Sequence, residues 1–240
     1  MRRKNQLRLQ MQLPPVYDYG TWTRHAGVEH ACNRLALWSL HGGNIWLASD
    51  AAAGKSHLLR TFATDQATVG ILTVEADKHV SDSWQLAQQW VESIQGSSHW
   101  MIDVPAGDMP QPVALALFHL VERARDLQSA IVIAWRGQAD DLPPELSSRL
   151  LAMEKIDMAA PADDTTLLEL LRSSAGCLQW DIREQVLQSM LVYLPRELDV
   201  LVAALHMLEA MSFDQKHKPG PAWVKQQLVR IAEQLHPSLP

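Results

Sequence analysis

Residues 44–60 carry the pattern of a phosphate-binding loop between a strand and a helix. Backbone N–H groups at a helix N-terminus bind phosphate oxygens, a Lys adds positive charge, and a Ser hydroxyl can ligate Mg²⁺. A chance Gly-Lys-Ser tripeptide is the alternative, but here an apolar run precedes the loop and an apolar-faced helix follows it. The residues expected to contact a nucleotide are Ser49, Ala51, Ala52, Ala53, Gly54, Lys55, Ser56 and His57.

This loop departs from the usual signature at one position, because Ser49 stands where a Gly is expected five residues before Gly54. A carboxylate on a neighbouring strand should help to hold Mg²⁺. Asp103 ends the apolar run 99–102 and is the candidate, so Ser56 and Asp103 form the predicted metal pair. Val104 follows where a second acid would prepare the attacking water. Asp103 therefore supports metal or nucleotide binding more than hydrolysis, and a lone Asp ending a strand is the alternative.

Two arginines have positions from which they could contact phosphate. Arg149 follows the fourth predicted strand and its helix, where a guanidinium could point towards the γ-phosphate of a neighbouring molecule. Such an Arg stabilises charge in the transition state when it is supplied in trans. Arg196 opens a later helix and could reach a phosphate from above. The alternative for Arg149 is a solvated surface group, and for Arg196 a pairing with Glu197 or water.

The N-terminal segment contains a short pattern that could bind a protein groove. Gln6, Leu7, Leu9 and Met11 combine a hydrogen-bonding amide with apolar side chains at alternate positions. An extended segment of this kind can insert into an apolar groove on a partner. An idle tail is the alternative.

Composition limits the class of protein. With 240 residues, 47% of them apolar and a net charge of −6, the chain is ordinary for a globular protein and poorly suited to bind nucleic acid by itself. Cys32 and Cys177 are far apart, which indicates neither a disulfide framework nor a zinc site. No run approaches the roughly 20 apolar residues of a membrane span, and the residues after Arg2 are too polar for a signal peptide. We expect a cytoplasmic protein that does not contact membranes.

The elements that must position these residues follow from the apolar pattern. Apolar runs alternate with helical stretches up to about residue 160, which predicts a parallel sheet covered by helices. The remaining chain predicts helices only, at about 163–175, 180–193, 196–211 and 221–235. The predicted strands are 44–48, 69–74, 99–104, 130–135 and 154–158, and the predicted helices among them are 27–40, 55–66, 82–95, 110–127 and one beginning near Pro143. We expect a tail over 1–18, an α/β domain over 19–160 and a helical domain over 161–240.

Taken together, these features resemble the DnaA-related AAA+ proteins, most closely the regulatory members that inactivate the replication initiator DnaA. The tail is similar to the motif with which those members bind the DNA polymerase III β sliding clamp, and it precedes the aromatic pair Tyr19 and Trp22. A Ser at the position of Ser49 is familiar in that group. The resemblance implies an α/β fold of the AAA+ P-loop NTPase type, with a parallel sheet domain and a small C-terminal helical lid domain.

The resemblance also implies roles for single residues. Asp103 matches the Walker B Asp, Arg149 the box VII arginine finger, and Arg196 the sensor 2 arginine of the lid. Val104 departs from the second acid or Asn of the family, and Arg136 lies in a segment that differs from sensor 1. These departures weaken the case for intrinsic ATPase activity but do not affect Arg149.

The function implied is the regulation of replication initiation. The chain would bind ADP or ATP, with Mg²⁺ as a further ligand, associate with the clamp, and promote hydrolysis of the ATP held by DnaA. DNA would be contacted only indirectly, and the chain could act as a monomer or a homo-oligomer. One alternative is an active P-loop ATPase that loads or remodels another replication protein. A second is a degenerate AAA+ adaptor that uses the fold as an interaction platform.

Overall fold

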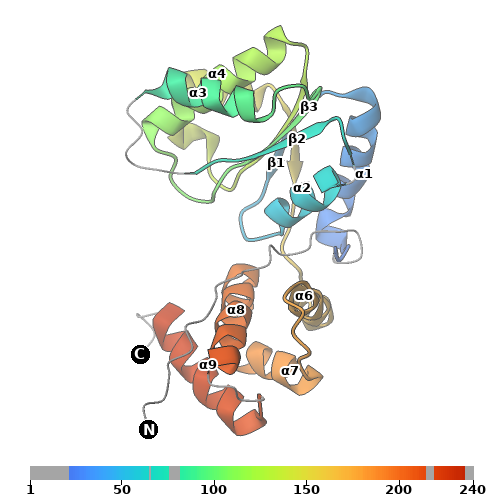
Figure 1. The fold of residues 1–240 in the computed structure, drawn as a ribbon, viewed down its shortest axis with the longest axis vertical. Helices are drawn as coiled ribbons and strands as arrows, with labels where there is room; N and C mark the ends of the chain where they lie inside the picture. The colour runs from blue at the N-terminus through green and yellow to red at the C-terminus, as the bar shows by residue number, and fades with distance from the viewer. Residues whose placement is uncertain (1–21, 65, 76–81, 215–218, 236–240) are drawn as a thin grey trace, which may run out of the picture.

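The computed structural model describes residues 22–64, 66–75, 82–214 and 219–235. Five strands form one parallel sheet in the order β2-β3-β4-β1-β5, at the upper part of the molecule in Figure 1. Parallel neighbours need long crossover connections, and helices supply them here. The strands are β1 (Asn44–Ala48), β2 (Val69–Thr73), β3 (His99–Asp103), β4 (Ala130–Ala134) and β5 (Glu154–Asp157).

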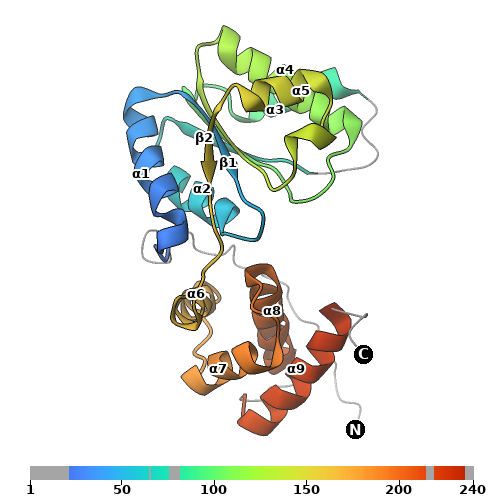
Figure 2. The same ribbon diagram turned by 180° about the vertical axis from the view of Figure 1, so that it is seen from behind.

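Helices cover both faces of the sheet (Figures 1 and 2). The helices α1 (Ala26–His41) and α2 (Lys55–Thr64) pack on one face; α3 (Ser83–Ser93), α4 (Gln111–Asp126) and α5 (Pro144–Leu151) pack on the other. In β1, Ile45 and Leu47 join the first core, whereas Trp46 joins the second. Strands buried on both faces read as continuous apolar runs, which is why the sequence predicted them. The predicted parallel sheet with covering helices is confirmed.

The C-terminal part contains only helices in its described residues: α6 (Asp164–Cys177), α7 (Glu184–Tyr193), α8 (Leu198–Asp214) and α9 (Pro221–Leu235). They surround a separate apolar core that includes Leu171, Met190, Leu205 and Leu228. Asp163 caps α6 because its carboxylate accepts hydrogen bonds from the Thr166 N–H and hydroxyl, which lower the pKa of this Asp. The part formed by α6 to α9 is called the lid below.

One boundary inside the lid was predicted wrongly. The first lid helix was predicted over 163–175, but α6 continues through Gly176 to Cys177. The chain turns instead at Gln179, which adopts a left-handed backbone conformation with φ 53°. The N–H of Trp180 donates back to the Ala175 carbonyl, a closing pattern that usually employs Gly. Helix α7 therefore starts at Glu184, four residues after the predicted start.

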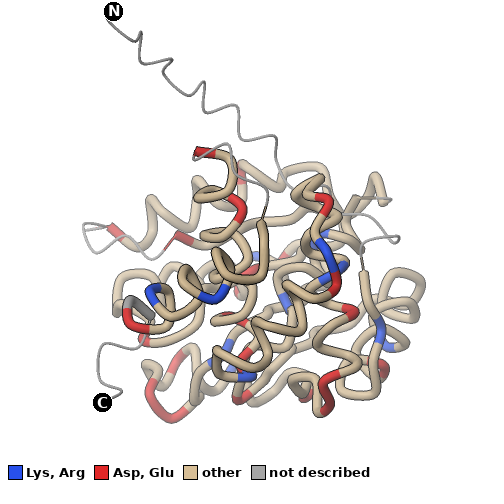
Figure 3. The backbone as a smooth tube through the Cα atoms, turned by 90° about the horizontal axis from the view of Figure 1, so that it is seen from below, with Lys and Arg blue, Asp and Glu red and all other residues tan. Residues whose placement is uncertain are grey.

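Several features of the surface and termini bear on the sequence predictions. Acidic and basic residues are interspersed along the backbone (Figure 3), and some are paired, such as Arg34 with Glu154 at 2.7 Å. In the part of the chain that the structure describes, every helix is too short or too polar to cross a membrane.

The predicted tail 1–18 lies outside the described residues, and so do its groove-binding residues Gln6, Leu7, Leu9 and Met11.

Candidate nucleotide-binding site

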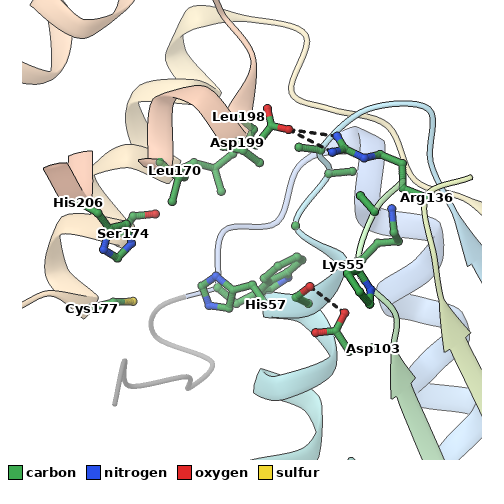
Figure 4. Close-up of a pocket in the computed structure, with 18 of the residues that line it drawn as sticks. Lys55, His57, Asp103, Arg136, Leu170, Ser174, Cys177, Leu198, Asp199 and His206 are labelled. Atoms are coloured by element: carbon green, nitrogen blue, oxygen red, sulfur yellow. Dashed lines mark hydrogen bonds and ion pairs between the residues drawn. The ribbon is translucent and has the colours of Figure 1, made fainter. Parts of the chain in front are cut away.

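A cavity of about 430 Å³ lies between the sheet domain and the lid (Figure 4). Its floor is formed by the loop between β1 and α2, the end of β3 and the residue Arg136 after β4. The lid contributes Leu170, Ser174, Leu198 and other side chains from α6 and α8. In parallel α/β sheets, ligands bind at the carboxyl ends of the strands, and this volume is within the range of small-molecule sites.

The phosphate-loop residues mostly line this cavity. Ala52, Ala53, Gly54, Lys55, Ser56 and His57 contribute to its wall, while Ala51 is exposed outside it. Gly54 has φ 78°, a conformation that favours glycine, and its carbonyl accepts the N–H of Leu58 at 2.9 Å. This turn lets α2 begin at Lys55, so the first turn of the helix lines the cavity, and helix N-termini are sites where backbone N–H groups can bind phosphate.

Ser49 has a direct contact with the loop lysine. The Lys55 ammonium donates a hydrogen bond to the Ser49 hydroxyl, and both residues are buried. Burial and, less strongly, charge repulsion by Arg136 together lower the pKa of Lys55 to about 8, although Asp103 opposes both effects. Ser49 thus replaces a glycine with a residue that holds the lysine in place.

Asp103 and Ser56 meet as the sequence predicted. The Ser56 hydroxyl donates to Asp103 Oδ1 at 2.8 Å, the hydrogen bond drawn at Asp103 in Figure 4. The Arg60 guanidinium lies 3.7 Å from Asp103 Oδ2. Burial raises the pKa of Asp103, partly opposed by Ser56, Arg60 and Lys55. A hydroxyl and a carboxylate fit Mg²⁺, which keeps several waters and takes other ligands from substrate phosphates. Ser56 and Asp103 would hold the metal ion, which would neutralise phosphate charge when bound.

An apolar and aromatic wall lies beside the phosphate loop. Trp22 and His57 meet edge to face with ring centroids 5.3 Å apart, and both line the cavity together with His25. Burial lowers the pKa of His25, partly opposed by Asp163. Aromatic side chains have apolar faces that suit a planar base better than they suit phosphates. The cavity therefore offers a polar floor for phosphates and a less polar wall for an attached ring.

A second cavity of about 390 Å³ adjoins the loop on the side of Ser49 and Asp50. Arg136 lines both cavities, and its two terminal nitrogens each donate to Asp199 Oδ2 of α8 at 3.2 Å. In the sequence, Arg136 stands out only as a departure from the sensor 1 pattern, and nothing singles out Asp199. A signal existed for Arg136, since it follows directly after a parallel strand. No local sequence signal marked Asp199, because its position at the cavity depends on how the lid packs.

Arg196 does not line either cavity. Its guanidinium donates to both carboxylate oxygens of Asp164 at 2.7 and 3.0 Å, and its side chain is 59% exposed. This hydrogen bonding lowers the pKa of Asp164. The pairing differs from the expected contacts with Glu197 or water. A contact between Arg196 and a phosphate stays a prediction.

Arg149 lies on α5, on the face of the sheet covered by α3 and α4, and it lines neither cavity. Its Nε donates to Glu122 Oε1 at 2.6 Å, and its guanidinium carbon lies 5.9 Å from the centre of the Phe118 ring. The side chain is 38% exposed. The guanidinium is therefore held at the surface by a carboxylate and an aromatic ring of α4.

Comparison with known proteins shows the fold. No protein-family model matches the chain, and no curated protein matches its sequence. Domain III of the replication initiation protein DnaA from Thermotoga maritima superposes with a TM-score of 0.67 at 15% identity, over 92% of this chain and 98% of that one. The RuvB Holliday junction branch migration motor from the same organism superposes with a TM-score of 0.60 at 12% identity. This match covers 92% of this chain and 73% of that one.

A third similar structure is the AMPPCP-bound DnaA from Aquifex aeolicus. Its TM-score is 0.54 at 15% identity, and the match covers 85% of this chain and 68% of that one. The chain therefore has the AAA+ P-loop NTPase fold, as the sequence predicted, and its structural neighbours are the AAA+ parts of DnaA and RuvB.

Proposed function

We propose that this chain is a nucleotide-binding AAA+ regulator of replication initiation that resembles Hda, the inactivator of DnaA. It binds ADP, or ATP, between the sheet domain and the lid. It is tethered to the DNA polymerase III β sliding clamp through Gln6, Leu7, Leu9 and Met11. From there it supplies Arg149 to the ATP held by DnaA and promotes its hydrolysis in trans, while DNA itself is contacted only through these partners.

Nucleotide binding is supported by the chemistry of the larger cavity. Its floor combines the first turn of α2, the buried ammonium of Lys55 and the hydrogen-bonded pair Ser56 and Asp103. These are the donors and metal ligands that a phosphate chain with Mg²⁺ requires. Two of the similar DnaA structures hold the ATP analogue AMPPCP, one of them together with single-stranded DNA.

The position of Arg149 carries the proposal that catalysis occurs on a partner. Arg149 lines neither cavity, so it is badly placed to act on a nucleotide bound by its own chain. Glu122 engages its Nε, which leaves the two terminal nitrogens without a hydrogen bond among the described residues. A guanidinium that is oriented at the surface with free donors suits insertion into a neighbouring active site, where it would stabilise charge on the γ-phosphate.

Weak intrinsic hydrolysis fits the same site. Val104, which follows Asp103, is buried and offers no group to polarise an attacking water. The cation after β4, Arg136, is paired with Asp199. Lys55, Ser56 and Asp103 suffice to bind phosphate and metal, but the chain's own water-activating residue is missing from this constellation. A bound nucleotide would then act as a structural and regulatory ligand.

The clamp tether would make a weak second contact effective. Linking two binding events raises the effective concentration of the second one, up to the millimolar range for short flexible connections. Gln6, Leu7, Leu9 and Met11 would occupy an apolar groove of the clamp loaded on DNA. DnaA bound nearby would then meet Arg149 at high local concentration.

The test is hydrolysis of DnaA-bound ATP in the presence of clamp-loaded DNA. Arg149→Ala should lose the stimulation by about a thousandfold, as for other arginine fingers supplied in trans. Arg125→Ala is the matched control, since Arg125 bonds the same Glu122 carboxylate at 2.6 Å and is 61% exposed. Equal stimulation by the Arg149 variant and wild type would overturn the assignment.

The alternative of an active P-loop ATPase is favoured by one observation. Ser56 and Asp103 are already hydrogen-bonded at 2.8 Å in the arrangement that holds a catalytic metal ion. This alternative expects the isolated chain to turn over ATP at a substantial rate that Lys55→Ala abolishes. A rate that does not exceed the uncatalysed background would leave the regulator proposal as the better one.

A further inference from the structure

Arg136 lies where the two cavities and the two parts of the chain meet. It follows β4 at the carboxyl edge of the sheet and lines both the larger and the smaller cavity. Its guanidinium crosses to the lid and binds Asp199 Oδ2 through both terminal nitrogens (Figure 4). The pair is partly exposed, with 31% of the Arg136 side chain and 47% of the Asp199 side chain accessible.

The two cavities approach each other at the hydrogen bond between Lys55 and Ser49. Lys55 lines the larger cavity, and its hydrogen-bond acceptor Ser49 lines the smaller one. In phosphate loops, the backbone cradles the α- and β-phosphates and the lysine reaches the β- and γ-phosphates. A diphosphate that follows this rule ends near Lys55. A third phosphate would extend beyond it, and Arg136 is the cation that lines both cavities there.

Asp199 and a terminal phosphate would use the same donors. A carboxylate and a phosphate both accept hydrogen bonds from paired N–H groups of a guanidinium. Either one anion displaces the other, or both share the donors and each hydrogen bond is weaker. Asp199 and Asp50, which lines the smaller cavity, are also both negative and would repel an added phosphate. The chain thus contains its own competitor for the third phosphate.

We propose that Arg136 discriminates between nucleoside triphosphates and diphosphates, with Asp199 as the internal competitor for the terminal phosphate. A diphosphate leaves the Arg136–Asp199 pair intact, whereas a triphosphate has to replace Asp199 as the partner of Arg136. The site is therefore biased towards ADP by its own carboxylate. This inference rests on the proposed function, because it concerns the same bound nucleotide.

The competition also connects the nucleotide to the lid. Among the described residues, α6 to α9 pack against one another and none packs extensively against a helix or strand of the sheet domain. Covalent continuity passes through the segment after β5, where the Ala159 N–H donates to the Gly27 carbonyl at 2.9 Å. Loss of the Arg136–Asp199 pair therefore removes a polar contact that spans the nucleotide cavity, and a triphosphate shifts the lid away from its position in this structure.

The experiment measures the affinities of Mg-ATP and Mg-ADP for the full chain by equilibrium titration. The variants are Asp199→Asn, Arg136→Ala and their combination, and the control Glu184→Gln breaks the exposed lid pair that Arg172 and Glu184 form at 2.7 Å. Asp199→Asn should raise the affinity for ATP by about three- to tenfold, the size expected for one partly exposed charged hydrogen bond. The affinity for ADP should change less than about twofold, and Glu184→Gln should change neither.

The combined variant gives the sharpest criterion. If Asp199 acts through Arg136, then Asp199→Asn should have no effect on ATP affinity once Arg136 is already alanine. An equal gain for ATP and ADP, or a gain that persists without Arg136, overturns the inference and leaves the proposed function standing. A folded wild-type chain that binds neither nucleotide overturns the proposed function and this inference together. Thermal unfolding of each variant checks that it is folded.

Discussion

The ammonium of Lys55 donates a hydrogen bond to the hydroxyl of Ser49, six residues earlier at the start of the same loop. Both side chains are buried, with 9% and 8% of their surfaces exposed. A buried ammonium without an acceptor is costly, so this bond explains why a serine is useful where phosphate loops usually have glycine. The relationship leads to a prediction about the nucleotide-free protein.

Ser49→Ala should lower the free energy of unfolding by about 1–3 kcal/mol without nucleotide, because it leaves the Lys55 ammonium short of an acceptor. Saturating ADP should reduce this difference, since phosphate oxygens then accept from Lys55. Urea unfolding with and without ADP measures both effects. The control Ser148→Ala removes an exposed hydroxyl that bonds the Glu145 carbonyl and should have little effect. Equal losses in the two variants would contradict the role of Ser49.

Nucleotide affinity should depend on pH through Lys55. Its pKa is lowered to about 8 in the folded chain, chiefly by burial, so Lys55 loses its charge as the pH rises above 8. Phosphate favours the protonated form, so binding takes up a proton and ADP affinity should fall by up to about tenfold per pH unit above pH 8. Titration calorimetry in buffers of different ionisation enthalpy measures the proton uptake.

Lys55→Arg is the matched control for this pH dependence, because a guanidinium stays charged throughout the range. The variant should bind ADP with a nearly flat profile between pH 7.5 and pH 9, whatever its absolute affinity. A slope equal to that of wild type would assign the titration to another group. The same pKa shift also affects stability. Between about pH 8 and pH 10.5, the unfolded chain still binds a proton that the folded chain has released, so the free energy of unfolding should rise with pH in this range.

Magnesium should strengthen nucleotide binding through Ser56 and Asp103. Removal of the metal with EDTA should weaken ADP binding by wild type by about tenfold, the value of one charge-assisted contact. Asp103→Asn should show weaker binding in Mg²⁺ and a much smaller further loss in EDTA, because the carboxylate ligand is already absent. Asp108→Asn, which alters an exposed acid in the loop between β3 and α4, is the control. An undiminished EDTA effect in Asp103→Asn would remove Asp103 from the metal site.

The sequence was informative wherever a function depends on local pattern. Apolar runs predicted the first four strands, and the small residues before Lys55 predicted the phosphate loop, because the requirements of each are met within about ten residues. The fifth strand, which is mostly exposed, was predicted from its place after the helix that begins near Pro143. Asp103 and Ser56 could be paired in advance, since parallel strands place their carboxyl ends at one edge of the sheet.

Contacts that depend on the placement of the lid were not predictable. Arg136 and Asp199 are 63 residues apart and meet only because α8 packs over the cavity. The pairing of Arg196 with Asp164 of α6 also depends on how the lid packs, and the sequence did not indicate it. The end of α6 at Gln179 also escaped prediction, because a glutamine gives no local sign that it will adopt a left-handed conformation.

Glu122 should act on catalysis in trans by positioning Arg149. It accepts from Arg149 Nε at 2.6 Å and leaves the terminal nitrogens for a phosphate. Glu122→Gln keeps an amide oxygen that can accept the same bond, so most of the stimulation of DnaA-bound ATP hydrolysis should remain. Glu122→Ala removes the acceptor and should lower the stimulated rate by about tenfold, because a misplaced guanidinium stabilises the transition state poorly.

Protein stability separates this positioning role from a structural one. The pair is partly exposed, at 38% for Arg149 and 23% for Glu122, so neither Glu122 variant should lose more than about 1 kcal/mol of unfolding free energy. Unfolding in urea and the stimulated hydrolysis rate are measured on the same preparations. If Glu122→Gln and Glu122→Ala lose the stimulation equally, the carboxylate charge matters and the hydrogen bond to Nε does not. If both retain it fully, Phe118 suffices to hold the arginine for its partner, since the ring lies 5.9 Å from the guanidinium carbon.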